Sequence, residues 1–148
     1  MYLASSNNTF TGKIYLNSGF TYITSGSDTS LGNANNVVEV NGGVLSAQTN
    51  DITIGSGHTI RVVGSSSNNG RIGAAAPVTM TLQGPIAGGG SLNKISSGTL
   101  ILEGAASYAG TTTISEGALR LTSTGTIPSS SNLIINGGGN FNIRNTIG

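Results

Sequence analysis

Glycines flanked on both sides by alternating apolar residues constrain the fold of this chain more than any other feature of its sequence. Around Gly117, apolar or β-branched residues lie five and three positions before the glycine and two and four positions after it. This period of two indicates strands with one buried face, and the glycine indicates a corner whose backbone conformation is cheap only for glycine. With one extra residue allowed after Gly57 and Gly138, the pattern predicts corners at Gly19, Gly43, Gly57, Gly98, Gly117 and Gly138.

The same pattern predicts which side chains are buried beside each corner. At Gly98 it assigns Ile95, Leu100 and Leu102 to the buried face. Three polar residues occupy positions where the pattern expects apolar ones, namely Thr21, Asn93 and Thr112.

The spacing between the corners distinguishes a stacked coil from a set of antiparallel hairpins. Gly98, Gly117 and Gly138 are 19 and 21 residues apart, and Gly19 and Gly43 are 24 apart. A recurrence near this length is typical of one coil of a β-solenoid, which buries its apolar face only when it stacks on neighbouring coils. We therefore expect an all-β parallel β-solenoid of about six or seven coils. The 14-residue step from Gly43 to Gly57 is too short for a coil, so one of these corners is expected at another edge.

A longer internal similarity predicts the organisation of the chain. Residues 7–25 align with residues 105–123 at a constant offset of 98. We interpret residues 1–148 as one solenoid segment with two related supermodules, at about 5–48 and 91–145, and a degenerate middle at 49–90.

Composition excludes several classes of partner. Only 7% of the residues are charged and the formal net charge is +1, so binding to nucleic acid or to an anionic membrane is not expected. No stretch reaches the roughly 18 to 20 apolar residues of a membrane span. The absence of cysteine excludes disulfides and thiolate metal sites.

Candidate catalytic groups are few and scattered. The single histidine, His58, has no carboxylate within six residues and is expected to be a solvated residue at the start of a strand. Spacing does not pair the acids, and isolated acids that aid solubility explain them adequately. We predict no catalytic, cofactor or metal site; the five acids are Asp28, Glu39, Asp51, Glu103 and Glu116.

Three asparagines stand two residues before a corner glycine: Asn17, Asn41 and Asn136. In stacked coils such positions can form a ladder in which each amide side chain bonds the next. We interpret these residues as a structural amide stack, interrupted where serine takes the place.

Residues 80–121 resemble the passenger-associated repeat of bacterial autotransporters. The matching residues are Leu92 and Lys94, then residues 98–102, Tyr108 and Gly110, and residues 114–121, with Ser107 where the repeat usually has asparagine. Weaker copies lie at residues 8–23 and 37–47. The resemblance implies a right-handed parallel β-helix that is extracellular or displayed on the bacterial cell surface. The chain then looks like an internal fragment, or a natural short relative with another mode of assembly.

Three functions are compatible with this resemblance. We favour a non-enzymatic, adhesin-type passenger segment that acts as a rigid stalk and contacts cell-surface or glycan ligands. The alternative is a self-assembling extracellular fibre subunit whose copies stack head to tail through uncapped ends. A carbohydrate-active enzyme, which needs two acids close together on one groove, is the least favoured.

Overall fold

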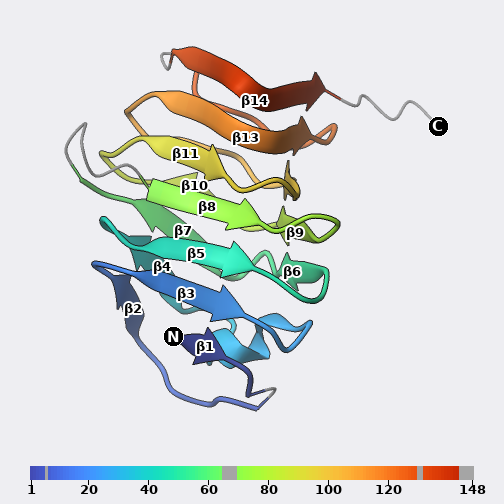
Figure 1. The fold of residues 1–148 in the computed structure, drawn as a ribbon. Coiled ribbons are helices and arrows are strands. Elements are labelled where there is room, and N and C mark those ends of the chain that lie inside the picture. The colour runs from blue at the N-terminus through green and yellow to red at the C-terminus, as the bar shows by residue number, and fades with distance from the viewer. Residues whose placement is uncertain (6, 65–69, 130–131, 144–148) are drawn as a thin grey trace.

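The chain folds into a parallel β-solenoid, as the corner spacing predicts. The structure is a computed structural model that describes residues 1–5, 7–64, 70–129 and 132–143. Across these residues it contains fourteen β-strands and one 3₁₀ helix, and all strand pairs are parallel. The N-terminus lies at one end of the stack and β14 at the other, with about six turns between them (Figure 1).

Face A of the solenoid is a stack of seven strands, seen from the front in Figure 1. It consists of β1 (Tyr2–Leu3), β3 (Phe20–Ile23), β5 (Val44–Ala47), β8 (Gly70–Ala74), β11 (Leu92–Ile95) and the first halves of β13 (Thr112–Leu121) and β14 (Leu133–Ile143).

Two further faces close each coil. After face A the chain enters face C, which consists of β6 (Ile52–Ile54), β9 (Thr79–Leu82), β12 (Thr99–Leu102) and the second halves of β13 and β14. It then enters face B, which consists of β2 (Lys13–Leu16), β4 (Val37–Val40), β7 (Thr59–Val62) and β10 (Ile86–Ala87). The 3₁₀ helix η1 (Asp28–Leu31) takes the place of a face C strand in the turn between β3 and β4.

The strands of neighbouring coils are aligned residue by residue. One row on face A runs through Phe20, Val44, Arg71, Asn93, Thr113 and Ile134. Successive members are 24, 27, 22, 20 and 21 residues apart in the sequence. Because side chains alternate along each strand, every row points either into the solenoid or out of it.

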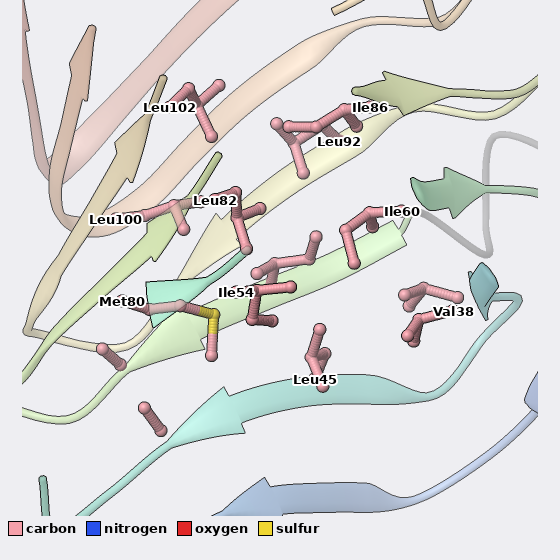
Figure 2. Close-up of a cluster of buried hydrophobic side chains, with 14 of the residues drawn as sticks. Val38, Leu45, Ile54, Ile60, Met80, Leu82, Ile86, Leu92, Leu100 and Leu102 are labelled. Atoms are coloured by element: carbon pink, nitrogen blue, oxygen red, sulfur yellow. The ribbon is translucent and has the colours of Figure 1, made fainter. Parts of the chain in front are cut away.

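The inward rows form one continuous apolar core. Val38, Ile60 and Ile86 follow one another on face B, and Met80 and Leu100 do so on face C (Figure 2). Each of these side chains is at most 1% exposed. Burial of apolar surface at about 25 cal/mol per Å² is the main favourable term, and each coil obtains it from the coils above and below.

The predicted burial is correct at three of the six corners. The apolar residues assigned beside Gly43, Gly57 and Gly117 are all buried. Beside Gly19, Ile14 is only partly buried. Beside Gly138, on the last coil, Leu133, Ile135 and Ile143 are exposed.

Beside Gly98, Ile95 is only partly buried, whereas Leu92 and Lys94 point inward and are fully buried. The pattern is out of phase there because the register places Lys94 opposite Ile114 of the next coil, and that residue points inward.

The six predicted corner glycines lie at three different edges of the solenoid. Gly19 and Gly43 join face B to face A, and Gly57 joins face C to face B. The other three lie at the edge between face A and face C, and they are Gly98, Gly117 and Gly138. The pattern thus marks a corner without identifying its edge, which explains the short step from Gly43 to Gly57.

The aligned supermodules also occupy different faces. The offset of 98 residues matches β2, on face B, with the first half of β13, on face A. The two supermodules therefore stay a prediction about the sequence, while the structure stacks all coils in one register.

Glycine is required at Gly98 and Gly117 for different physical reasons. Gly117 has a φ of +68°, and a Cβ there would also collide with the Gly98 carbonyl oxygen of the preceding coil. Gly98 has no left-handed backbone, but its Cβ would lie 2.5 Å from the Val78 carbonyl oxygen. At Gly138, on the last coil, the nearest atom to an added Cβ is 3.5 Å away.

We expect Gly117→Ala to lower the free energy of unfolding by about 2 to 4 kcal/mol. Alanine is strained in the left-handed backbone conformation, and its Cβ collides with the preceding coil. The matched control Gly138→Ala should change the free energy of unfolding by no more than about 0.5 kcal/mol. Urea unfolding monitored by circular dichroism measures the free energy of unfolding of both variants. Equal losses in the two variants would contradict the close approach of coils at Gly117.

Candidate functional site

The chemistry of this chain is concentrated in polar side chains that point into the solenoid or lie along its edges. Seven polar or charged residues are buried among those that the structure describes: Thr21, Ser30, Asn36, Ser46, His58, Lys94 and Thr112. Thr21 and Thr112, which interrupt the apolar pattern, therefore do face the core. Burying such groups is costly unless each one is hydrogen-bonded.

Lys94 is a fully buried lysine at the edge between face A and face C. Its inward row places it between Ile72 and Ile114, both completely buried. The ammonium nitrogen Nζ donates to the carbonyl oxygens of Ile95 (2.9 Å), Ser96 (2.6 Å) and Glu116 (2.9 Å). An ammonium has three donors, so this site satisfies all of them with backbone acceptors.

These three hydrogen bonds stabilise a strained corner. Ser96 has a φ of +67°, the left-handed region that costs a non-glycine residue about 1 to 2 kcal/mol. The Lys94 ammonium binds the carbonyl of this residue and, one coil further on, the carbonyl of Glu116. Lys94 therefore joins the turn of one coil to the turn of the next. The lysine of the passenger repeat has a structural role here, which its position in the motif alone does not reveal.

Burial lowers the pKa of Lys94 from 10.5 to about 8, and the negative charge of Glu116 partly opposes this effect. The charged form of the lysine is thus less favourable in the folded chain than in water.

His58 is buried, so the prediction of a solvated histidine is wrong. Its side chain is 1% exposed, and its Nδ1 lies 3.1 Å from the carbonyl oxygen of Asn36. Because a carbonyl only accepts, Nδ1 is the donor in this contact. Its Nε2 lies 3.5 Å from a carboxylate oxygen of Asp28. This pair has no signal in the sequence, because Asp28 is 30 positions from His58 and approaches it only through the placement of η1.

The groups around His58 link several coils. The Asp28 carboxylate accepts from the backbone N–H of Gly55 at 2.8 Å. The Asn36 amide donates to the carbonyls of Phe10 (3.0 Å) and Leu31 (2.8 Å) and accepts from the N–H of Gly12 (2.9 Å). This network joins η1 and the segment before β2 to the coils above them. We call Asp28, Asn36 and His58 the brace, because their contacts hold these segments in place.

Tyr108, the aromatic residue of the repeat, belongs to the core. It is 1% exposed, and its hydroxyl is hydrogen-bonded to the hydroxyl of Thr112, an inward residue of β13. Burial raises the pKa of Tyr108 to about 12, and the hydrogen bond to Thr112 partly opposes this rise.

The acids connect neighbouring coils. Glu39 on β4 lies 3.5 Å from the guanidinium of Arg61 on β7. Asp51 accepts from the backbone N–H of Thr79 at 2.7 Å. Glu103 accepts from the side-chain amide of Gln83 at 3.0 Å. Each of these contacts joins two neighbouring coils on the outside of the solenoid. The three acids therefore have a structural role.

The predicted amide stack is divided between two edges. Asn17 and Asn41 directly follow Leu16 and Val40, which are paired in register, so these two asparagines lie in adjacent coils where face B meets face A. Asn136 lies within β14, where face A meets face C. A single stack of all three is therefore excluded, and bonding between the first two stays a prediction.

Comparisons with known proteins identify the repeat. Residues 92–121 match the family model of the Passenger-associated-transport-repeat. The chain is also 36% identical over 155 residues to the Adhesin BmaC autotransporter of Brucella suis biovar 1 (strain 1330). That match covers 99% of this chain and 4% of the relative. No solved structure matches the chain. Among the described residues there is no helix with the length and apolarity needed to cross a membrane.

The lowered pKa of Lys94 predicts a pH-dependent stability. Between pH 8 and pH 10 the folded chain releases the Lys94 proton while the unfolded chain, with a pKa near 10.5, keeps it. Stability therefore rises with pH in this window, by about 1 to 2 kcal/mol. Urea unfolding at a series of pH values measures the rise.

Lys94→Met removes the titrating group while it keeps a long unbranched side chain, and we expect the rise to disappear. Lys13→Met, at an exposed lysine of β2, is the matched control and should retain the rise of the natural chain. A rise that persists in Lys94→Met would show that another group causes it.

Proposed function

This chain carries an autotransporter passenger repeat, and we propose that it is a non-enzymatic, adhesin-type passenger segment that acts as a rigid β-solenoid stalk on a bacterial surface. The observation that supports this proposal best is the continuous register. Every face A strand from β1 to β14 pairs with its neighbour, so that no coil is free to move independently. Such a ladder resists bending and extension because many backbone hydrogen bonds must break together.

The dimensions suit a spacer. With about 4.8 Å per coil, six coils extend the chain by on the order of 30 Å. The relative that it matches carries the word adhesin in its name, and this chain spans 4% of that relative's length. A segment of this size contributes one section of a longer stalk, on which other segments or its own outer faces make contact with a target.

A non-enzymatic role agrees with the uses of the reactive side chains. His58 and Lys94 are buried and in contact with backbone carbonyls, and His58 Nε2 also lies 3.5 Å from the Asp28 carboxylate. The acids Glu39 and Glu103 each have a partner one coil away. These contacts stabilise the stack and leave the same groups poorly placed to act on a substrate.

Rigidity is tested by the distance between two spin labels. The chain has no cysteine, so Phe20→Cys and Ile134→Cys together provide two unique labelling sites on one outward row of face A. Five coil steps separate them, and because both labels point outward from one row, we expect one narrow distance distribution centred at about 24 Å. Double electron–electron resonance measures it. A broad or multiple distribution would contradict the stalk.

A fibre subunit is the second candidate, and an exposed apolar row on β14 favours it. The inward residues of β14 include Leu133, Ile135 and Ile143, which are 36%, 49% and 67% exposed. An uncovered strand with an apolar row is a template for pairing with another strand. In this proposal copies stack head to tail, β14 of one copy lying against the β1 end of the next.

Negative-stain microscopy and size-exclusion chromatography of the purified chain test the fibre. We expect filaments that Ile135→Lys abolishes, because the charge would be buried at the junction. The matched variant Ile134→Lys, on the outward row of the same strand, should leave them intact. Monodisperse monomers of the natural chain would exclude this second candidate.

A further inference from the structure

Three aromatic rings gather on the outside of face A, near its N-terminal end. The chain has four tyrosines and three phenylalanines, and Tyr2, Phe20 and Tyr22 form one cluster, which we call the aromatic patch. The Tyr2 and Tyr22 ring centroids are 5.1 Å apart, on adjacent strands β1 and β3. The Phe20 and Tyr22 rings are nearly parallel, at 17°, with centroids 5.7 Å apart. The rings therefore pack against one another and form a platform that spans two coils, in which each ring covers part of its neighbour's face.

The aromatic patch is open to solvent. Tyr2 is 65% exposed and Phe20 is 48% exposed, while Tyr22 is partly buried between them. The outward residues of the next strand, Val44 and Ser46, are both buried. Exposed aromatic rings are not needed for the core, which the inward residues Thr21 and Ile23 complete on the same strand.

The charges nearest to the patch are engaged with backbone groups. The Arg71 guanidinium, two coils from Phe20 in the same row, donates to the Gly42 carbonyl at 2.6 Å. The Met1 ammonium donates to the Phe20 carbonyl at 2.7 Å. The platform thus presents ring faces or edges and two phenolic hydroxyls, which are uncharged.

We propose that the aromatic patch binds an uncharged, linear glycan. A pyranose ring has a C–H face that packs against an aromatic ring, and it has hydroxyls at its rim that exchange hydrogen bonds with a phenol. Tyr2 and Tyr22 repeat at the spacing of one coil, which suits successive units of an extended sugar chain. This inference rests on the proposed adhesin-type function and gives that function a ligand class and a location.

The size of the patch favours a glycan over a second copy of the chain. At about 150 to 250 Å² per aromatic side chain, three partly exposed rings offer on the order of 300 Å². A stable protein interface needs about 800 Å² from each partner. Nucleic acids and anionic membranes both require several basic groups close together, whereas the outward row that begins at Phe20 holds one basic side chain, Arg71.

Isothermal titration calorimetry with cellohexaose, a linear β-1,4-linked glucose oligosaccharide, tests the proposal on the full chain. We expect binding in the micromolar to millimolar range. Tyr2→Ala and Tyr22→Ala should each weaken it by about fivefold or more, because each removes a stacking ring. Tyr22→Phe keeps the ring and should retain most of the affinity.

The control is Tyr15→Ala, which removes a tyrosine that is 57% exposed on face B, away from the patch. It should bind as tightly as the natural chain. Circular dichroism and urea unfolding confirm that each variant is folded, and the highly exposed Tyr2 provides a variant that leaves the core untouched.

Three results would overturn the proposal. The first is no binding of cellohexaose at millimolar concentration, and the second is binding that Tyr15→Ala abolishes but Tyr2→Ala leaves unchanged. The third is a patch-dependent self-association in analytical ultracentrifugation, or patch-dependent sedimentation with phosphatidylcholine vesicles, in the absence of glycan binding. The spin-label distance tests the stalk separately, so failure of the glycan site and failure of the proposed function are distinguishable.

Discussion

The stacking of each coil on the next, in register and at the spacing of two hydrogen-bonded strands, is the constraint on which the rest of this structure depends. It fixes the position of every side chain in an inward or an outward row, because a strand alternates its side chains. It also brings the carbonyls of one coil so close to the corners of the next that Gly43, Gly57 and Gly98 have no room for a Cβ. The glycine content of the chain is largely a consequence of this approach.

The same constraint explains why polar residues can be buried here at all. A corner leaves carbonyl groups that point along the edge of the stack, and a buried donor can reach carbonyls from two successive coils. Lys94 uses this arrangement with the carbonyls of Ser96 and Glu116. His58 and Asn36 use it at another edge, together with the carboxylate of Asp28. In each network the hydrogen bonds offset the cost of burying the polar groups and also join successive coils.

Local sequence patterns predicted the strands, the corners and the parallel solenoid, because alternation and glycine are properties of short segments. They could not predict what depends on register. The phase of the pattern around Gly98 predicts Ile95 in the core, whereas the adjacent coil determines that Lys94 points inward. His58 looked isolated because Asp28 approaches it only when η1 folds against the coil above. The resemblance to the passenger repeat supplied the lysine and the tyrosine of the motif but not their burial.

The inward rows contribute to stability, whereas the outward rows are available for recognition. The inward rows stay mainly apolar from coil to coil, with Thr21, Lys94 and Thr112 as exceptions, because each inward side chain must pack on the same position above and below. An outward row has no such requirement, and the one that begins at Phe20 continues with Val44, Arg71, Asn93, Thr113 and Ile134. Its chemistry changes at every coil while the backbone beneath stays the same. A solenoid of this kind can therefore acquire or lose a binding surface, such as the aromatic patch, by substitutions that leave the stack intact, and its ligand must be inferred from the outer rows because the repeat motif describes mainly the corners and the core.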